Sequence, residues 1–175
     1  MTEKEPLQKS YGEQLRSFLI ESNAIEGVYD QDSLDQANYA WEYLISQNNL
    51  KPSVIFETHR VLMEHQRINL EHKGYWRDCN VRIGPFGAPD WTLIPQLMQA
   101  WIEEVNTSAT FHLSEEEQDL LLQDFHVRYE KIHPFVDGNG RTGRMFWNFL
   151  RLKRGLPLKI IREEDRQEYY RLFRN

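Results

Sequence analysis

The stretch HPFVDGNGRTGR, which runs from residue 133 to residue 144, decides how this sequence is interpreted. Its centre, Gly138, Asn139 and Gly140, lets the backbone adopt positive φ angles, and a helix is expected to begin directly behind it. In that geometry successive backbone N–H groups point at one place and can bind an anion. The stretch therefore predicts a phosphate-binding turn.

Charged side chains flank this turn on both sides. Arg141 and Arg144 fall on one face of the expected helix, where each guanidinium can bind two phosphate oxygens. Asp137 offers a hard oxygen ligand to a magnesium ion that bridges two phosphates. His133 is a group able to move a proton near neutral pH. Taken singly, these residues are more often turn, packing or surface residues, but together they indicate a triphosphate site.

The stretch resembles the motif of the Fic family, HPF-x-[DE]-GNGR-x-x-R, at every specified position. A match of this length is far more specific than a lone glycine-rich turn. The resemblance implies a mainly α fold, a Fic-type helical bundle with a short β-hairpin flap over the active site. It also implies protein adenylyltransferase activity, in which AMP passes from ATP to a Tyr, Thr or Ser hydroxyl of a target protein, or of the enzyme itself, with Mg²⁺ bound.

By the same resemblance each position of the motif has a role. His133 is the general base, and Asp137 holds the metal. A subgroup of the family with lysine at the position of Gly140 phosphorylates its targets instead, so the glycine favours nucleotidyl transfer. Arg144 is assigned to the γ-phosphate. The residues assigned to the phosphates are Gly138, Asn139, Gly140, Arg141 and Arg144.

A second pattern near the N-terminus points to regulation. Residues 22–27, SNAIEG, match the family's inhibitory pattern [ST]-x-x-x-E-[GN]. Apolar residues at helical spacing precede it, so an amphipathic inhibitory helix is expected over about residues 12–27, with Gly27 as its C-terminal glycine. The resemblance implies that Glu26, together with Ser22, closes the site by pairing with Arg144. An ordinary exposed helix end is the alternative.

Other functions remain open at this stage. In some relatives the glutamate of this pattern is thought to position a water that removes AMP, so the same site can act as a deAMPylase. A nucleotide-binding pseudo-enzyme and a simple nucleotide hydrolase are the remaining alternatives. The intact His133 and Asp137 argue against the pseudo-enzyme, and the flap argues against the hydrolase, because a hydrolase needs no edge on which a target strand docks.

The middle of the chain predicts this flap. Alternating residues between Gly74 and Gly84 indicate a strand, and the turn-rich residues 85–90 follow. The resemblance implies that Val81, Arg82 and Ile83 cover the nucleotide or dock the target segment. A surface hairpin without a ligand role is equally compatible with the local pattern.

Near the C-terminus, the residues around Tyr169 and Tyr170 resemble the part of related Fic enzymes that closes the adenine pocket. The two rings are expected to flank the adenine, with one of them as plain core the alternative. The relatives continue beyond the position of Asn175, so the base is less firmly indicated than the phosphates.

Most of the remaining chain is expected to be helical. Apolar stripes cover residues 33–46, a segment from Pro52, a segment from Pro95, and the helix that follows the motif. Ser114 and Glu117 predict a capping box for the helix that carries His133. The other histidines have no zinc-ligand spacing, and Cys79 is the lone cysteine.

Composition agrees with one domain. The chain has 175 residues and 40% hydrophobic content, which suits a single Fic domain over residues 11–175 after a flexible terminus at 1–10. A net charge of −6 argues against nucleic acid as a partner. The lack of a long apolar run argues against a membrane, and one cysteine without a signal peptide favours the cytoplasm. Relatives form dimers, so a homodimer is a further expectation.

Overall fold

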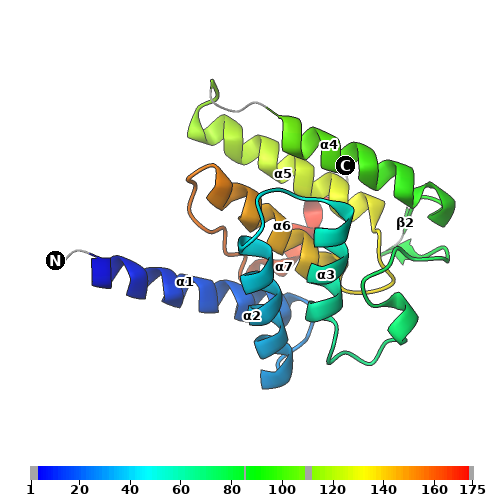
Figure 1. Ribbon diagram of the computed structural model, residues 1–175, viewed down its shortest axis with the longest axis horizontal. Helices are drawn as coiled ribbons and strands as arrows, with labels where there is room; N and C mark the ends of the chain where they lie inside the picture. Colours follow the sequence, from blue (N-terminus) through cyan, green and yellow to red (C-terminus); the bar gives the residue numbers. More distant parts are fainter. Residues whose placement is uncertain (1–3, 85, 109–111, 174–175) are drawn as a thin grey trace.

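The computed structural model describes residues 4–84, 86–108 and 112–173, and it is mainly helical (Figure 1). The predicted fold class is therefore confirmed. The helices are α1 (Lys4–Ile25), α2 (Gln31–Ile45), α3 (Pro52–Leu62), α4 (Ile94–Thr107), α5 (Glu115–Ile132), α6 (Asn139–Lys153) and α7 (Arg166–Arg171). Short 3-10 turns cover Leu70–His72, Trp91–Leu93 and Glu163–Asp165. Strands β1 (Arg82–Ile83) and β2 (Phe86–Gly87) form one antiparallel hairpin.

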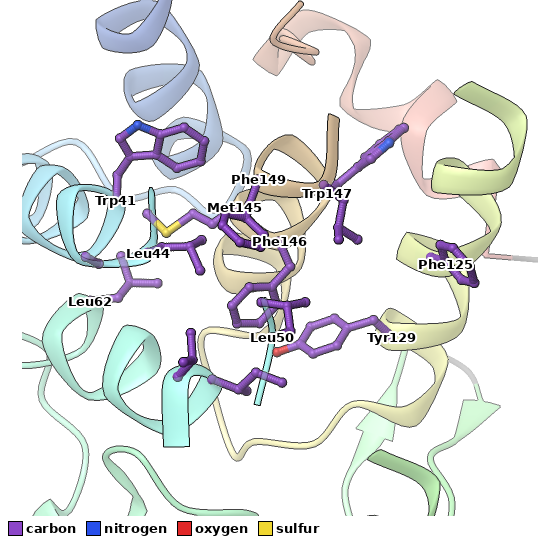
Figure 2. Packing of buried hydrophobic residues seen from close by; sticks show 14 of the residues in the cluster. Trp41, Leu44, Leu50, Leu62, Phe125, Tyr129, Met145, Phe146, Trp147 and Phe149 are labelled. Atoms are coloured by element: carbon purple, nitrogen blue, oxygen red, sulfur yellow. The ribbon is translucent and has the colours of Figure 1, made fainter. Parts of the chain in front are cut away.

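Helix α6 is the centre of the molecule. It packs against α1, α2, α3 and α5, and Figure 2 shows its aromatic residues between Trp41 of α2 on one side and Tyr129 of α5 on the other. Helix α6 buries polar side chains as well as apolar ones. Each buried polar side chain needs a hydrogen-bond partner inside the protein. They are Asn139, Arg141, Thr142, Arg144, Asn148 and Arg151.

Local sequence signals set the ends of several helices. The Ser114 hydroxyl accepts a hydrogen bond from the Glu117 backbone N–H at 3.2 Å, and the Glu117 carboxylate accepts one from the Ser114 N–H at 2.8 Å. The predicted capping box is confirmed, and it fixes the start of the helix that leads to the motif. Pro52 and Pro95 lie in the first turns of α3 and α4, where a missing N–H costs nothing.

Helix α1 ends in a Schellman motif, as its C-terminal glycine predicts. Gly27 has a φ of 72°, its N–H donates to the Ala24 carbonyl at 2.9 Å, and the Val28 N–H donates to the Asn23 carbonyl at 3.1 Å. Glu26 is therefore the last residue before the chain turns away. The helix begins earlier than expected, because residues 4–10, predicted as a flexible terminus, continue its hydrogen-bonded backbone.

The strand expected between Gly74 and Gly84 is mostly absent from the described residues. Gly74 has a φ of 82°, which turns the chain out of an extended path. The backbone N–H of Arg77 donates to the carbonyl of Pro134 at 2.9 Å, so this segment bonds to the motif loop and not to a partner strand. The prediction of a strand from alternation was wrong here because tertiary hydrogen bonds replaced the ladder.

The hairpin itself is short. Arg82 pairs with Gly87 and Ile83 pairs with Phe86, and the Ala88 N–H donates to the Val81 carbonyl at 3.1 Å. The turn residue Pro85 lies outside the described residues. In the described part of the chain, no helix is both long and apolar enough to cross a membrane.

Candidate active site

His133 sits where α5 ends and the motif loop begins. It adopts the left-handed conformation, with φ 52° and ψ 63°, and its N–H still donates to the Tyr129 carbonyl at 3.0 Å. Its Nδ1 lies 3.3 Å from the Glu130 carbonyl oxygen, which can only accept, so Nδ1 carries the proton. Burial lowers the pKa of His133. The ring is therefore neutral near pH 7, with the Nε2 lone pair able to take a proton.

Arg77 holds the loop around His133 and was not predicted as a site residue. Its side chain is 1% exposed. Its Nε donates to the His133 carbonyl at 2.8 Å, while its terminal nitrogens donate to the carbonyls of Cys79 at 2.8 Å and Pro89 at 2.6 Å. One guanidinium thus ties the motif loop to both ends of the segment that carries the hairpin.

His59 of α3 fixes the other side of the loop. Its Nδ1 accepts a hydrogen bond from the Gly74 N–H at 2.9 Å, so its Nε2 carries the proton and donates to the Asp137 carbonyl at 2.9 Å. Its ring stacks on Phe135 at a centroid distance of 3.7 Å. Burial lowers its pKa to about 4, which keeps the ring neutral. No local pattern around His59 predicts this role, and the spacing of the histidines does not indicate a zinc site.

Replacing His59 tests how far the loop depends on it. His59→Phe keeps an aromatic ring beside Phe135 but leaves the Gly74 N–H and the Asp137 carbonyl without partners, so we expect it to lower the free energy of unfolding by about 2 to 4 kcal/mol. Urea unfolding measures this loss. The exposed His65 gives the control, since His65→Phe should change stability by less than about 0.5 kcal/mol. If both changes lower the free energy of unfolding equally, His59 does not hold the loop in this way.

The glycine-rich turn is rigid. Gly138 has a φ of 77°, and a Cβ at this position would lie 2.7 Å from the Met63 sulfur, so no other residue fits there. The Asn139 side chain accepts from the Phe135 N–H and donates to the Phe135 carbonyl, both at 2.9 Å. The Thr142 hydroxyl donates to the Gly138 carbonyl at 2.9 Å. These bonds fix the first turn of α6, where the sequence predicts an anion site and where helical N–H groups have no intrahelical partner.

Asp137 is exposed at the outer edge of this turn. Its carboxylate accepts a hydrogen bond from the Gly138 N–H at 2.6 Å, which orients it. The described residues hold no cluster of three or more His, Cys, Asp or Glu side chains that could bind a metal. A single oriented carboxylate beside an anion site suits Mg²⁺, which takes its other ligands from phosphates and water.

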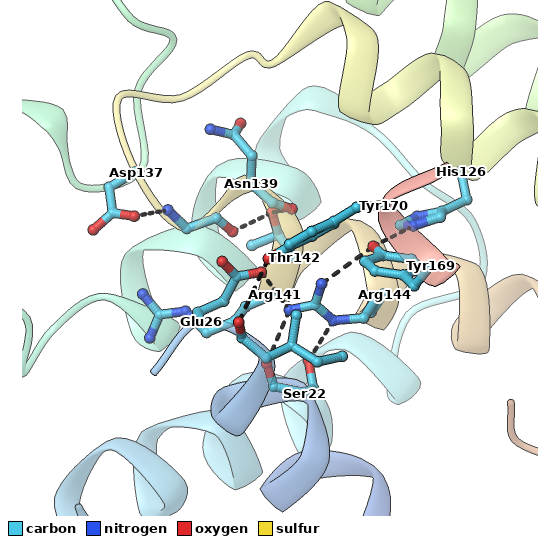
Figure 3. Close-up of polar contacts among 12 residues, drawn as sticks. Ser22, Glu26, His126, Asp137, Asn139, Arg141, Thr142, Arg144, Tyr169 and Tyr170 are labelled. Carbon is cyan, nitrogen blue, oxygen red and sulfur yellow. Dashed lines mark hydrogen bonds and ion pairs between the residues drawn. The ribbon is translucent and has the colours of Figure 1, made fainter. Parts of the chain in front are cut away.

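Arg144 is 2% exposed and meets α1 directly. Its Nη2 donates to Glu26 Oε1 at 2.7 Å and to the Ser22 carbonyl at 2.9 Å, and its Nε donates to the Ser22 hydroxyl at 2.9 Å (Figure 3). Ser22 and Glu26 of the predicted inhibitory pattern therefore both contact the last motif arginine. The pair is charge-assisted, with a buried guanidinium and a carboxylate side chain that is 32% exposed.

Glu26 also lies against the glycine-rich turn of the motif. A Cβ on Gly140 would clash with Glu26 Oε1 and would lie 3.0 Å from a terminal nitrogen of Arg144. The carboxylate therefore occupies the space that the bare glycine backbone leaves beside the first turn of α6. Because an anion is already present at this helix end, a phosphate group has to displace it or bind elsewhere.

Arg141 behaves differently from Arg144 although both belong to the motif. Its Nη2 lies 3.2 Å from the sulfur of Met63, the residue that follows α3. Its Nε and Nη1 are buried and have no hydrogen-bond partner in the described part of the chain. Buried guanidinium nitrogens without partners are costly, and an incoming anion would satisfy them.

A cleft of about 910 Å³ opens between these elements and the hairpin, a size that holds a nucleotide. Tyr170 at its wall is half-buried, whereas Tyr169 is 5% exposed. The predicted site residues that line the cleft are Glu26, Arg82, Ile83, His133, Gly140, Arg144, Tyr169 and Tyr170. The predicted site residues that are not part of its lining are Ser22, Gly27, Val81, Asp137, Gly138, Asn139 and Arg141.

Comparison with known proteins accounts for this arrangement. A family model described as the Fic/DOC family matches residues 49–150. This chain belongs to the Fic/DOC family. The match includes the whole motif but neither α1 nor α7, so the Ser22 and Glu26 contacts lie outside the part by which the family is recognised.

Named relatives and solved Fic structures extend the similarity. Over 166 residues the chain is 28% identical to "Protein adenylyltransferase Fic" of Drosophila melanogaster, a match that covers 90% of this chain and 32% of that protein. The chain thus spans about a third of that relative. A Fic domain containing signaling protein from Bacteroides thetaiotaomicron aligns with a TM-score of 0.80 at 21% identity, over 95% of this chain and 73% of that one. Fic-1 from C. elegans aligns with a TM-score of 0.82 at 19% identity, over 98% and 58%. The Fic fold therefore covers nearly the whole chain.

Proposed function

We propose that this Fic protein transfers AMP from ATP to a hydroxyl side chain of a target protein, and that Glu26 inhibits the transfer. The observation that carries the proposal is that one cleft collects His133, Gly140 and Arg144. A proton acceptor, an anion-binding backbone and a buried cation are what attack of a hydroxyl on a triphosphate requires. Relatives named adenylyltransferases support the choice of ATP.

In the proposed reaction His133 Nε2 takes the proton of the target hydroxyl. The hydroxyl oxygen then forms a bond to the α-phosphorus, the bond from that phosphorus to the β-phosphate oxygen breaks, and pyrophosphate leaves. Charge develops on the phosphate oxygens during this step. The N–H groups at the start of α6 and the buried guanidinium of Arg144 stabilise it, and the unpartnered nitrogens of Arg141 serve the outer phosphates.

Asp137 is proposed to hold Mg²⁺. The metal, when bound, neutralises negative charge on the phosphates. Asp137 contributes an oriented carboxylate at the edge of the phosphate turn, with one oxygen held by the Gly138 N–H.

The hairpin edge at Arg82 and Ile83 is proposed to align the target segment, because an extended peptide can add to such an edge through its main chain.

The role of Asp137 predicts a change in metal dependence. Asp137→Ala should lower AMP transfer by at least about a hundredfold, because the charge on the phosphates is no longer neutralised in place. Transfer measured over a magnesium titration should also lose its saturation. Asp78→Ala, which removes another exposed carboxylate, serves as the control and should titrate like the parent. An unaltered magnesium curve for Asp137→Ala would count against the assignment.

The role of Arg144 predicts selective loss of ATP. In a Glu26→Gly background, Arg144→Ala should weaken ATP binding by about tenfold or more and ADP binding by less than about twofold, since only ATP carries the γ-phosphate. Calorimetry with both nucleotides measures this difference. Arg60→Ala, at an exposed arginine on α3, should leave both affinities unchanged. Equal losses for ATP and ADP would contradict the assignment.

A second candidate is hydrolytic removal of AMP from a modified target at the same site. It is favoured by the position of Glu26, whose side chain is 32% exposed and lines the same cleft as His133, so a water can reach its carboxylate. A carboxylate beside a phosphodiester can act as a base. Under this alternative Glu26→Gly loses AMP removal.

Transfer from labelled ATP separates these functions. Protein that acquires α-label from ATP shows AMP transfer, whereas γ-label shows phosphorylation. Free AMP without labelled protein indicates a hydrolase, and bound but unchanged ATP indicates a pseudo-enzyme. Pre-labelled protein that loses AMP in the presence of Glu26, and keeps it in Glu26→Gly, supports the removal reaction.

A further inference from the structure

Arg144 has a second set of contacts on the side away from α1. Its Nη1 donates to the Tyr169 hydroxyl at 3.1 Å, and the same hydroxyl lies 2.8 Å from His126 Nε2 (Figure 3). His126 belongs to α5 and Tyr169 to α7, and both side chains are buried.

The direction of these hydrogen bonds follows from chemistry. An arginine can only donate, so the Tyr169 oxygen accepts from Arg144. If the Tyr169 proton is donated to His126 Nε2, the ring is neutral with its own proton on Nδ1, which has no hydrogen-bond partner in the described part of the chain. The other tautomer would leave the Tyr169 proton without an acceptor, so we assign the first. Burial, together with the nearby charge of Arg144, lowers the pKa of His126 to about 3, in agreement with a neutral ring. A protonated His126 would leave the Tyr169 proton without an acceptor.

Packing prevents the pair from turning away. The His126 ring stacks on Trp147 with a centroid distance of 4.6 Å and an angle of 17°. Gly143 lies against the same group of side chains, because a Cβ there would clash with Glu130 Oε1 and lie 2.9 Å from Tyr129 Cδ1 and 3.2 Å from His126 Cε1. Phe173 meets the Tyr169 ring edge-on at 5.0 Å. Both rings therefore have one orientation, and the hydroxyl is fixed in front of Arg144.

These contacts do not depend on the inhibitory helix. Ser22 and Glu26 hold Nε and Nη2 of Arg144 from α1, whereas Tyr169 holds Nη1 from α7. When the Glu26 side chain withdraws, the guanidinium loses its carboxylate partner, keeps the Ser22 contacts at Nε and Nη2, and keeps the Tyr169 hydroxyl at Nη1. An arginine is a useful phosphate ligand only if its fork stays oriented, since a free side chain of this length loses much entropy on binding.

We propose that His126 and Tyr169 form a positioning pair that keeps the Arg144 guanidinium at the triphosphate end of the cleft after Glu26 has left. The proposal rests on the proposed function of the same site. It gives the two C-terminal tyrosines different roles. The Tyr169 hydroxyl accepts a hydrogen bond from Arg144, while the half-buried Tyr170 is the one that faces the nucleobase. His126 acts through Tyr169 and touches no substrate.

The test uses the full chain with Glu26→Gly and three added changes. Tyr169→Phe removes only the hydroxyl, and His126→Phe keeps a flat ring against Trp147 but removes the acceptor. Each should weaken ATP binding by about tenfold and ADP binding by less than about twofold, as expected for one hydrogen bond to a charged group. His126→Gln offers an amide oxygen as acceptor and should restore most of the ATP affinity. The double change Tyr169→Phe with His126→Phe should weaken ATP binding no more than either single change.

Arg144→Ala provides the matched control. If the pair acts through Arg144, Tyr169→Phe has no further effect on ATP binding once Arg144 is absent. Losses that are equal for ATP and ADP, or that persist in Arg144→Ala, would mean a general structural role and would overturn the proposal.

A readout without nucleotide keeps this test separate from the proposed function. The order parameter of the Arg144 Nε–H, measured by NMR in Glu26→Gly, should fall when Tyr169→Phe is added. An unchanged order parameter would overturn the positioning pair even if AMP transfer is established. A lower order parameter would support it even if no AMP is transferred.

Discussion

Glu26→Gly is expected to raise AMP transfer by between about tenfold and a hundredfold, because the carboxylate gives up a charge-assisted hydrogen bond to Arg144 that has to be broken before the γ-phosphate can bind. Glycine is tolerated at this position, since Glu26 is the last residue before the left-handed Gly27 and lies outside the helix interior. Incorporation of α-label from ATP into the protein itself and into proteins of a cell lysate measures the effect.

Two comparisons sharpen this experiment. Glu26→Gln keeps the shape of the side chain and its contact with Arg144 but removes the charge, so its transfer rate should lie between those of the parent and Glu26→Gly. The γ-labelled nucleotide run in parallel excludes a kinase. If Glu26→Gly transfers no more α-label than the parent, the inhibitory role of Glu26 is wrong.

His133→Asn, placed in the Glu26→Gly background, is expected to lower AMP transfer by about a hundredfold to ten-thousandfold, since the target hydroxyl loses its proton acceptor. Asparagine suits the test because it tolerates the left-handed backbone that His133 adopts, at φ 52°, better than alanine does. ATP binding should stay within about twofold of the background, because His133 is assigned to the hydroxyl and not to the phosphates. The AMP transfer rate and the ATP affinity, measured on the same protein preparation, test this assignment.

The control for this change is His65→Asn, at an exposed histidine far along the sequence from the motif. It should affect neither rate nor affinity. Transfer that survives His133→Asn would exclude His133 as the base, and a loss of ATP binding equal to the loss of rate would show that the residue holds the nucleotide instead.

The parts of the site that could be predicted are those in which one short segment carries the chemistry. The motif loop holds its own acid, glycines and arginines in order, and the Schellman end of α1 puts Glu26 beside Arg144, as the inhibitory pattern indicates. Helix ends marked by a capping box or a proline were predicted for the same reason, because their partners lie within a few residues.

The parts that could not be predicted depend on contacts between distant segments. His59 bonds to residue 137 and Arg77 to residue 133, and neither histidine nor arginine carries a local signal for a backbone carbonyl far along the chain. Alternation between Gly74 and Gly84 indicated a strand, but the same residues bond to the loop. The hydrogen bond from Arg144 to the Tyr169 hydroxyl had no local signal either, because it joins a buried arginine of α6 to a residue 25 positions along the chain.

The Arg77 guanidinium has a consequence for accuracy in catalysis. It binds the carbonyl of His133 on one side and the carbonyls of Cys79 and Pro89, which bracket the hairpin, on the others. His133, the proposed proton acceptor, and the edge proposed to bind the target therefore share one anchoring side chain. A displacement of about 1 Å between reacting groups can cost a hundredfold in rate. With a common anchor, thermal motion of the hairpin is transmitted to the loop, so the spacing between them varies less than either element does alone.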